Sequence, residues 1–104
     1  MARGLHPYLA MIARRVPHVA RAYGFNAKVT SGYRSYAKQN QLYQSWLRGG
    51  NPYPASPPGR SSHERGVALD VWSDNLPMLV ALLEAAGLKW YGPKDPVHFS
   101  IPGL

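Results

Sequence analysis

Two histidines and an aspartate in the second half of the chain have the residue types of a metal site. His63 lies seven residues before Asp70, and His98 follows in a later segment. Zinc accepts imidazole and carboxylate ligands, and a catalytic zinc commonly keeps three protein ligands and leaves a fourth position to water. Asp95 lies three residues before His98, where it could act on that water as a general base. Spacing alone leaves a second interpretation open, in which the same residues are structural polar groups.

The segment Gly66–Trp72 alternates between apolar residues and small or polar ones, which is typical of a β-strand. The alternation places Asp70 on the face that carries two of the smallest residues, so the carboxylate has open space in front of it. His63 would point to the opposite face of a regular strand, because seven positions is an odd offset. We therefore expect a bend over residues 64–66 that turns the imidazole toward Asp70.

A second segment, from Asp95 to Ile101, is predicted to be a turn that leads into a short strand. Its apolar residues alternate with His98 and Ser100, so these two polar residues should face away from the core. This orientation would allow His98 to converge with the other two ligand-type side chains.

These residues belong to a longer pattern, Ser61-x-His63-x-x-Gly66-x-Ala68-x-Asp70, followed by Trp90 and Asp95-x-x-His98-Phe99. The pattern resembles the zinc peptidases that cut peptidoglycan stem peptides: VanY-like D-Ala-D-Ala carboxypeptidases, VanX-type dipeptidases and phage L-Ala-D-Glu endopeptidases. The stretch Ser31-Gly32-Tyr33-Arg34-Ser35 resembles the upstream motif of the same family. The resemblance runs from about Ala27 to Ser100. Its main departure is Asp95, where many members carry glutamate and others carry aspartate.

The resemblance implies a role for each residue of the predicted centre. His63, Asp70 and His98 would hold Zn²⁺, and Asp95 would take the proton of the metal's water and later deliver it to the leaving amine. Arg34 would point into the cleft, where a fixed cation stabilises the developing oxyanion.

Two further residues are expected near the centre. Ser61 would either contact the substrate or orient a metal ligand, and the sequence does not separate these roles. Gln39 is expected to hydrogen-bond near the turn that carries Arg34.

The activity implied by the resemblance is zinc-dependent hydrolysis of an amide bond in peptidoglycan. Capture of a terminal D-Ala carboxylate requires a well-placed cation, and the candidates Arg60, Arg65 and Lys94 fall on irregular segments. We therefore expect an endopeptidase, and the resemblance to phage enzymes implies that it is an L-alanyl-D-glutamate endopeptidase, an endolysin. The alternatives are a D-alanyl-D-alanine carboxypeptidase on the same scaffold and a non-catalytic zinc-bearing wall-binding module, as in the hedgehog signalling domain. A tail-associated or a bacterial remodelling enzyme would also fit.

Length and composition narrow the protein classes. The 104 residues suggest a single domain spanning 1–104, expected to be a monomer. The absence of cysteine excludes disulfides and thiolate zinc sites. A formal net charge of +7 favours polyanions, namely nucleic acid, an anionic membrane surface or the bacterial cell wall. No nucleic-acid-binding signature accompanies the charge, so we expect peptidoglycan and not nucleic acid as the partner.

Membrane and export signals are not expected in the chain. No apolar run approaches the ~18 residues of a membrane span. The first residues do not resemble a signal peptide, because His6-Pro7 and Arg14-Arg15 interrupt the apolar region. We expect a protein made in the cytoplasm without its own export signal that acts on the bacterial wall, in the host periplasm or wall if it is phage-encoded.

Periodicity predicts an α+β fold, in which a small antiparallel sheet carries the zinc site and packs against helices, as in the peptidase family and the hedgehog domain. The expected helices cover Leu5–Tyr23, Ser35 to about Arg48, and Leu76–Ala86, and further strands cover Phe25–Thr30 and Leu88–Tyr91. Pro17 should kink or split the first helix. In the second helix an apolar stripe is formed by Tyr36, Tyr43, Trp46 and Leu47, most of which are expected to pack in the core. The loop Gly49–Ser62 should form a partly mobile rim of the cleft.

Overall fold

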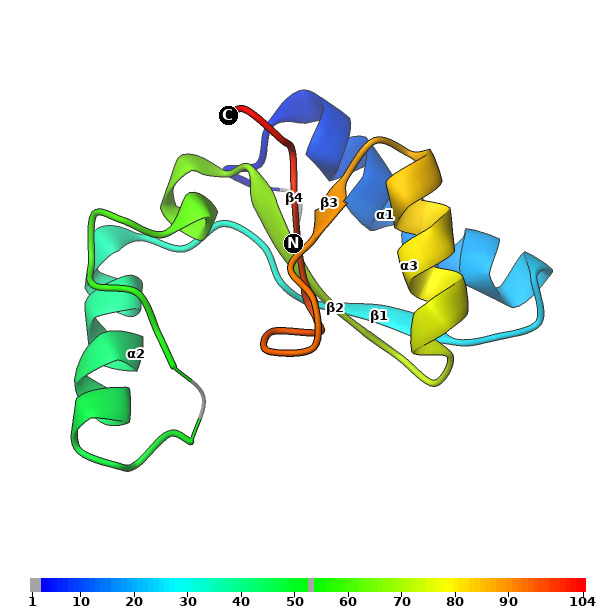
Figure 1. Ribbon diagram of the computed structural model, residues 1–104. Helices are drawn as coiled ribbons and strands as arrows, with labels where there is room; N and C mark the ends of the chain where they lie inside the picture. The colour runs from blue at the N-terminus through cyan, green and yellow to red at the C-terminus, as the bar shows by residue number, and fades with distance from the viewer. Residues whose placement is uncertain (1–2, 53) are drawn as a thin grey trace.

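A computed structural model describes residues 3–52 and 54–104 of the chain and has the α+β architecture expected from the sequence (Figure 1). The elements follow in the order α1 (Pro7–Ala22), β1 (Ala27–Ser31), α2 (Tyr36–Leu47), the 3₁₀ helix η1 (Ser62–Arg65), β2 (Ala68–Ser73), α3 (Leu76–Ala85), β3 (Lys89–Trp90) and β4 (His98–Ser100). None of the helices in the described residues is long and apolar enough to cross a bilayer.

The four strands form one antiparallel sheet in the order β1-β2-β4-β3. In this sheet Asp70 of β2 lies directly opposite His98 of β4. An irregularity after Val29 brings Ser31 of β1 opposite Asp70 on its other side. Directly paired residues of neighbouring strands have side chains on the same face. The register therefore lines up two predicted metal ligands and a hydroxyl across one face of the sheet.

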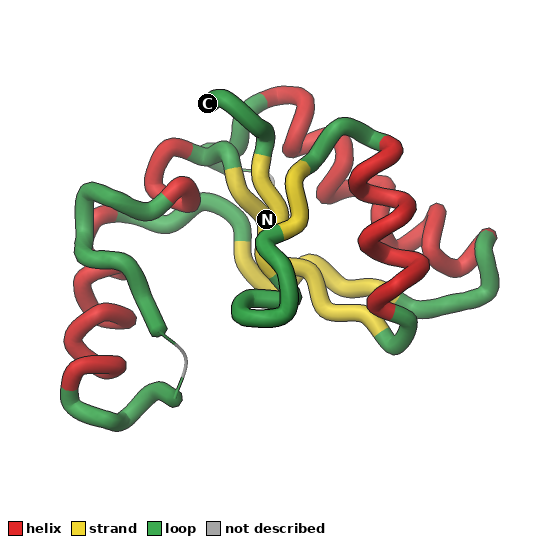
Figure 2. Tube along the Cα trace, in the orientation of Figure 1, coloured by secondary structure: helices red, strands yellow, loops and turns green. Residues whose placement is uncertain are grey.

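Helices α1 and α3 cover the other face of the sheet (Figure 2). Leu69, Val71 and Phe99 are fully buried in the core that the sheet shares with these helices. Because successive side chains of a strand alternate between faces, burial of Leu69 and Val71 beneath the helices directs Asp70 away from them. The helix layer thus fixes which face of β2 is available for chemistry.

The bend predicted over residues 64–66 is present, and the 3₁₀ helix η1 forms it. Gly66 ends η1 with a φ of 72°, a left-handed conformation that favours glycine. A Cβ at this position would lie 2.1 Å from the carbonyl oxygen of Gly4, so the close approach also requires glycine. The strand itself begins at Ala68. The expectation that it starts at Gly66 is wrong, because the backbone is still completing the turn there.

Helix α2 departs from the predicted packing. It stands apart from the sheet and from α1 and α3 (Figure 1), and Gln39 is its buried residue. Tyr36 and Leu47 are 65% and 56% exposed, so the prediction that they pack in the core is wrong. The rings of Tyr43 and Trp46 are partly buried and lie 6.2 Å apart. Periodicity indicates that a helix has an apolar face, but it does not show whether another layer of the structure covers that face.

The remaining elements differ from expectation by a few residues at their ends. Helix α1 continues through Pro17, so the proline does not split it. Strand β1 begins at Ala27 and not at Phe25, and β3 is confined to Lys89 and Trp90. The 49–62 segment has no α-helix or β-strand before η1 in its described part, which leaves out Tyr53.

Candidate metal centre

His63, Asp70 and His98 converge on one point, as their spacing predicted. Nε2 of His63 lies 3.1 Å from Oδ1 of Asp70 and 3.2 Å from Nδ1 of His98. The third side of the triangle, from Nδ1 of His98 to Oδ1 of Asp70, measures 3.4 Å. The residues come from η1, β2 and β4, so the packing of three separate elements is needed to assemble them.

The size of this triangle fits a tetrahedral ion. Zinc binds imidazole nitrogen and carboxylate oxygen at about 2.0–2.1 Å, which gives a regular tetrahedron with edges of about 3.3–3.4 Å. The three observed separations of 3.1, 3.2 and 3.4 Å are close to that edge length. Three atoms that each direct a lone pair to one point repel one another unless a proton or a cation lies between them. The donor set therefore fits a divalent cation with His63, Asp70 and His98 as its ligands.

The orientation of His63 is fixed from behind. Its Nδ1 lies 2.8 Å from the carbonyl oxygen of Gly32, and because a carbonyl only accepts, Nδ1 must donate. Nε2 of the neutral ring then carries the free lone pair, which is directed at the cluster. The side chain is almost fully buried, so its tautomer is set by protein contacts and not by solvent. A carbonyl behind a metal-binding histidine is the usual way to orient the ring and raise its basicity.

His98 presents the other ring nitrogen, Nδ1, to the cluster. Its Nε2 lies 3.3 Å from the Oγ of Ser62. The ring of Tyr91 meets the imidazole edge-on, with centroids 4.2 Å apart. The sequence analysis missed both neighbours. Ser62 occupies a position that the motif leaves open. Tyr91 lies next to His98 because β3, which ends just before Tyr91, pairs with β4. No local sequence pattern indicates that pairing.

Asp70 divides its two oxygens between the histidines and Arg34. Oδ1 faces the two imidazoles, whereas Oδ2 accepts a hydrogen bond of 2.7 Å from Nη2 of Arg34. Burial opposes ionisation of this carboxyl, but its contacts with His63 and His98 and the charge of Arg34 outweigh that effect. The pKa of Asp70 is therefore held well below its usual range, and the group is available as an anionic ligand at every working pH.

Arg34 was expected to point into the cleft, and the structure shows its guanidinium bound to three neighbours. Besides Nη2 on Asp70, Nε donates to Oγ of Ser31 over 3.1 Å and Nη1 donates to Oε1 of Gln39 over 3.2 Å. The predicted hydrogen bond of Gln39 near this turn is thus present. Nε2 of Gln39 donates in turn to the carbonyl oxygen of Ser56 over 2.8 Å. In this arrangement Arg34 supports the Asp70 ligand, while its predicted action on an oxyanion stays a prediction.

Asp95 lies at the open side of the cluster. Its Oδ2 is 3.8 Å from Nδ1 of His98, and the side chain is 56% exposed. Partial burial raises the pKa of the Asp95 carboxyl, with the nearby charge of Asp70 acting in the same direction and His98 opposing it. The position beside the ligand atoms and the raised pKa both suit the predicted general base.

Ser61 hydrogen-bonds to the backbone at the start of the 3₁₀ helix that carries His63. Its Oγ accepts a hydrogen bond from the N–H of His63 over 3.2 Å, and the Glu64 carboxylate accepts one from the N–H of Ser61 over 3.4 Å. This reciprocal pair is a capping box, which fixes the start of η1. Ser61 is nearly buried. Of the two predicted roles, these contacts correspond to orienting a ligand, through the backbone of the helix that carries it.

Comparison with known proteins shows the family to which the chain belongs. The sequence profile of VanY, described as D-alanyl-D-alanine carboxypeptidase, matches residues 2–92. The chain belongs to the VanY family. The matched region contains His63, Asp70 and Arg34, whereas Asp95 and His98 follow it. The register of β2 and β4 brings His98 next to Asp70 of the matched region.

Solved structures share the fold. The LD-carboxypeptidase LdcB is similar with a TM-score of 0.75 at 21% identity, over 97% of this chain and 68% of that chain. A zinc(II) complex of the vancomycin-resistance D,D-pentapeptidase VanY is similar with a TM-score of 0.71 at 23% identity, over 93% and 70% of the two chains. The L-Ala D-Glu endopeptidase ChiX of Serratia marcescens gives 0.64 at 25% identity, over 96% and 82%. The fold is therefore one on which several stem-peptide specificities occur.

Proposed function

We propose that the protein is a zinc-dependent hydrolase of peptidoglycan stem peptides. The observation that carries the proposal is the triangle of His63, Asp70 and His98, whose edges of 3.1–3.4 Å suit a tetrahedral ion. Membership of the VanY family supports a peptidase, and the zinc(II) in a VanY structure of the same fold supports the choice of metal.

In this proposal each residue of the centre has one task. His63, Asp70 and His98 would hold the zinc, which when bound would supply a water whose pKa is lowered toward neutrality. Asp95 accepts a proton from the attacking water and passes it to the nitrogen of the leaving amine, so that the scissile C–N bond breaks to give a free amine and a carboxylate. Arg34 holds Asp70 in its ligand orientation, and its N–H groups beyond the three bonds described could stabilise negative charge on the carbonyl oxygen.

For the bond that is cut, we propose L-alanyl-D-glutamate, the specificity of an endolysin-type endopeptidase acting on the cell wall. Capture of a terminal carboxylate requires a fixed cation besides Arg34. Arg60, Arg65 and Lys94 are all exposed, and the contact described for Arg65 is with the carbonyl oxygen of Leu104 over 3.4 Å. None of these three cations contacts the metal ligands in the described part of the chain. The family description favours the competing D-alanyl-D-alanine carboxypeptidase, so the products have to decide between the two.

Mass spectrometry of digested peptidoglycan distinguishes the two activities. An endopeptidase releases peptides that begin with D-Glu and leaves L-Ala on the muramyl residue. A carboxypeptidase releases free D-Ala and leaves both the remaining stem peptide and its attachment to the glycan intact. New D-Glu amino termini are the expected result. Free D-Ala as the only product would overturn the endopeptidase assignment and leave the zinc chemistry in place.

A further inference from the structure

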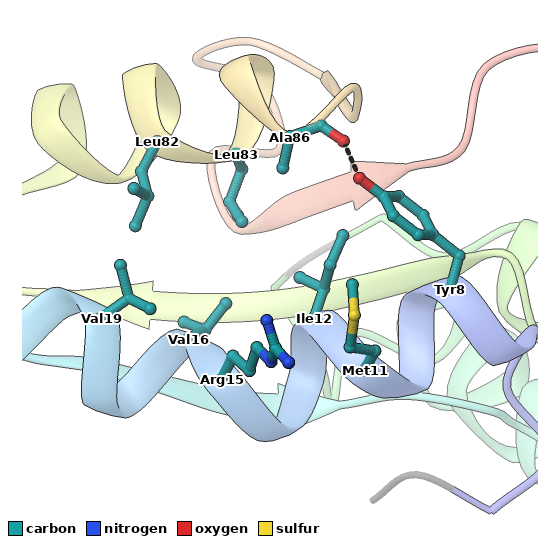
Figure 3. Close-up of a pocket in the computed structure, with 9 residues that line it drawn as sticks. All are labelled: Tyr8, Met11, Ile12, Arg15, Val16, Val19, Leu82, Leu83 and Ala86. Carbon is teal, nitrogen blue, oxygen red and sulfur yellow. Dashed lines mark hydrogen bonds between the residues drawn. The ribbon is translucent and has the colours of Figure 1, made fainter.

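An apolar trough runs along the outer surface of the helix layer, between α1 and α3. Figure 3 shows Val16 and Val19 of α1 pointing toward Leu82 and Leu83 of α3 across it. The hydroxyl of Tyr8 donates a hydrogen bond to the carbonyl oxygen of Ala86 and closes one end (Figure 3). A second hollow continues the trough past Leu82 toward the other ends of the two helices, where its lining includes Tyr23, Phe25 and Met78.

Large apolar side chains remain exposed along this trough. Tyr8 is 41% exposed, Tyr23 63% and Met78 39%, and they lie at the ends of the two joined hollows. The first hollow encloses about 190 Å³, which is below the ~300–1,000 Å³ of sites that enclose a drug-sized ligand. The trough is therefore better suited to contact with an extended apolar surface than to a single enclosed small molecule.

The trough is also cationic. Arg15 lines it among apolar residues, and within the described residues its guanidinium has no hydrogen bond or ion pair. Arg14 and Arg21 are also exposed on α1 but do not line the trough, and Nη2 of Arg21 lies 3.0 Å from Nδ1 of His18. The sequence contains no acidic residue before Glu64, and nine of its twelve lysines and arginines precede that position. No carboxylate thus competes for these arginines from the helix that carries them.

We propose that this α1–α3 face docks on an anionic phospholipid bilayer. An apolar strip with tyrosines at its ends and an arginine along it that has no ion pair matches the interfacial region of such a membrane, where apolar groups enter the acyl boundary and arginine meets lipid phosphates. A second copy of the chain would bring the same positive charge to the contact, which disfavours self-association. Asp70 lies on the opposite face of the sheet from these helices, so a protein docked in this way presents the metal centre away from the bilayer.

Co-sedimentation with lipid vesicles tests this proposal, and the metal centre is not needed for it. The intact protein should bind vesicles of phosphatidylglycerol and phosphatidylcholine in preference to phosphatidylcholine alone, and binding should weaken with salt because charges at a surface are screened. Arg15→Gln, which removes the arginine that lines the trough, should lower the partition coefficient by about fivefold. Met78→Ser and Tyr23→Ser should lower it on the same anionic vesicles by removing apolar contact.

Matched controls are available on α2, which lies outside this face. Arg48→Gln removes an exposed charge and Leu47→Ser an exposed apolar side chain of similar accessibility, and both should bind vesicles as the unchanged protein does. Equal losses from the α1 and α2 variants would show attraction by net charge alone and would overturn the docking face. Equal binding of the unchanged protein to zwitterionic and to anionic vesicles would also overturn the docking face. Dimerisation of the unchanged protein that is lost in Met78→Ser, as measured by light scattering, would also overturn the docking face. The trough would then be an interface between copies.

Discussion

Nη2 of Arg34 lies 2.7 Å from Oδ2 of Asp70, on the side of the carboxylate opposite the two histidines. The guanidinium therefore lies behind the predicted metal ligand, where Ser31 and Gln39 hold it. Charge-assisted hydrogen bonds of this kind are short and directional. They fix which oxygen of Asp70 faces the two histidines, so the geometry of the candidate metal centre depends on a residue that contacts none of the three predicted ligand atoms.

Replacement of Arg34 should weaken metal binding. Arg34→Ala removes the partner of Asp70 Oδ2, and loss of such an outer contact typically costs 10–100-fold in metal affinity. Arg34→Lys should recover only part of it, because a single ammonium cannot reach Asp70, Ser31 and Gln39 at once. Zinc affinity is measured by competition with a chromophoric chelator. An unchanged affinity together with a lower kcat would instead assign Arg34 to the oxyanion role implied by its motif.

Gln39 links Arg34 to the 49–61 segment, and its side chain is almost fully buried. Gln39→Leu should lower the free energy of unfolding by about 1–3 kcal/mol, since it leaves an Arg34 N–H and the Ser56 carbonyl without this partner. Gln44→Leu, on the exposed side of the same helix, is the matched control and should change stability by less than about 0.5 kcal/mol. Urea unfolding of the two variants measures the difference. Equal effects would show that the buried link adds no stability.

Asp95 should be separable from the ligands. Asp95→Asn is nearly isosteric, so zinc content and melting temperature should be retained while the rate of hydrolysis falls by about 10²–10⁴-fold. In the unchanged protein the rate should fall as pH drops through the raised pKa of Asp95, because a protonated carboxyl cannot accept the water's proton. Metal analysis and a pH–rate profile check both statements. Loss of zinc in parallel with activity would make Asp95 a ligand.

Asp74 provides a pH-dependent contribution to stability away from the centre. Its carboxylate accepts hydrogen bonds of 2.8 Å from the backbone N–H and the side-chain amide of Asn26, and these lower the pKa of Asp74. A carboxyl with a lowered pKa binds fewer protons folded than unfolded, so its contribution is present above the ordinary pKa and is lost as pH falls through the folded-state value.

The comparison between the protein and Asp74→Asn tests this contribution. Both should be melted in chelator, so that release of metal does not add to the pH dependence. The difference in melting temperature should be largest at neutral pH and should shrink below about pH 4. A difference that stays constant across this range would show that the Asn26 contacts do not depend on the charge of Asp74.

The sequence was sufficient to predict that the three candidate ligands converge, but it did not reveal the residues that hold them in place. The convergence of Asp70 and His98 could be predicted because strand alternation directs both away from the core, and that of His63 because a bend over residues 64–66 was needed to bring it to the same side. Gly32, Ser62 and Tyr91 could not, since their roles arise from pairing between distant segments that leaves no local pattern. The same limit explains α2, whose apolar stripe was predicted from periodicity as core although no layer covers Tyr36 or Leu47.

Arg34 shows, for a single side chain, which features the sequence predicts and which it does not. Its place in a turn before a helix was correctly expected, because Ser35 is a good N-cap and accepts from the N–H of Lys38. Its contact with Asp70 depends on where β1 ends relative to β2, and the irregularity after Val29 sets that register. A sequence pattern with period two does not reveal such a shift.

Hydrolysis of purified peptidoglycan with and without chelator tests the central claim most directly. The protein should release stem-peptide fragments, lose this activity on removal of metal and regain it when zinc is added. His63→Ala, Asp70→Ala and His98→Ala should each behave as the chelated protein does and melt at a lower temperature, because a ligand that binds only the folded state stabilises it. Undiminished hydrolysis by a preparation shown to be free of metal would contradict the account.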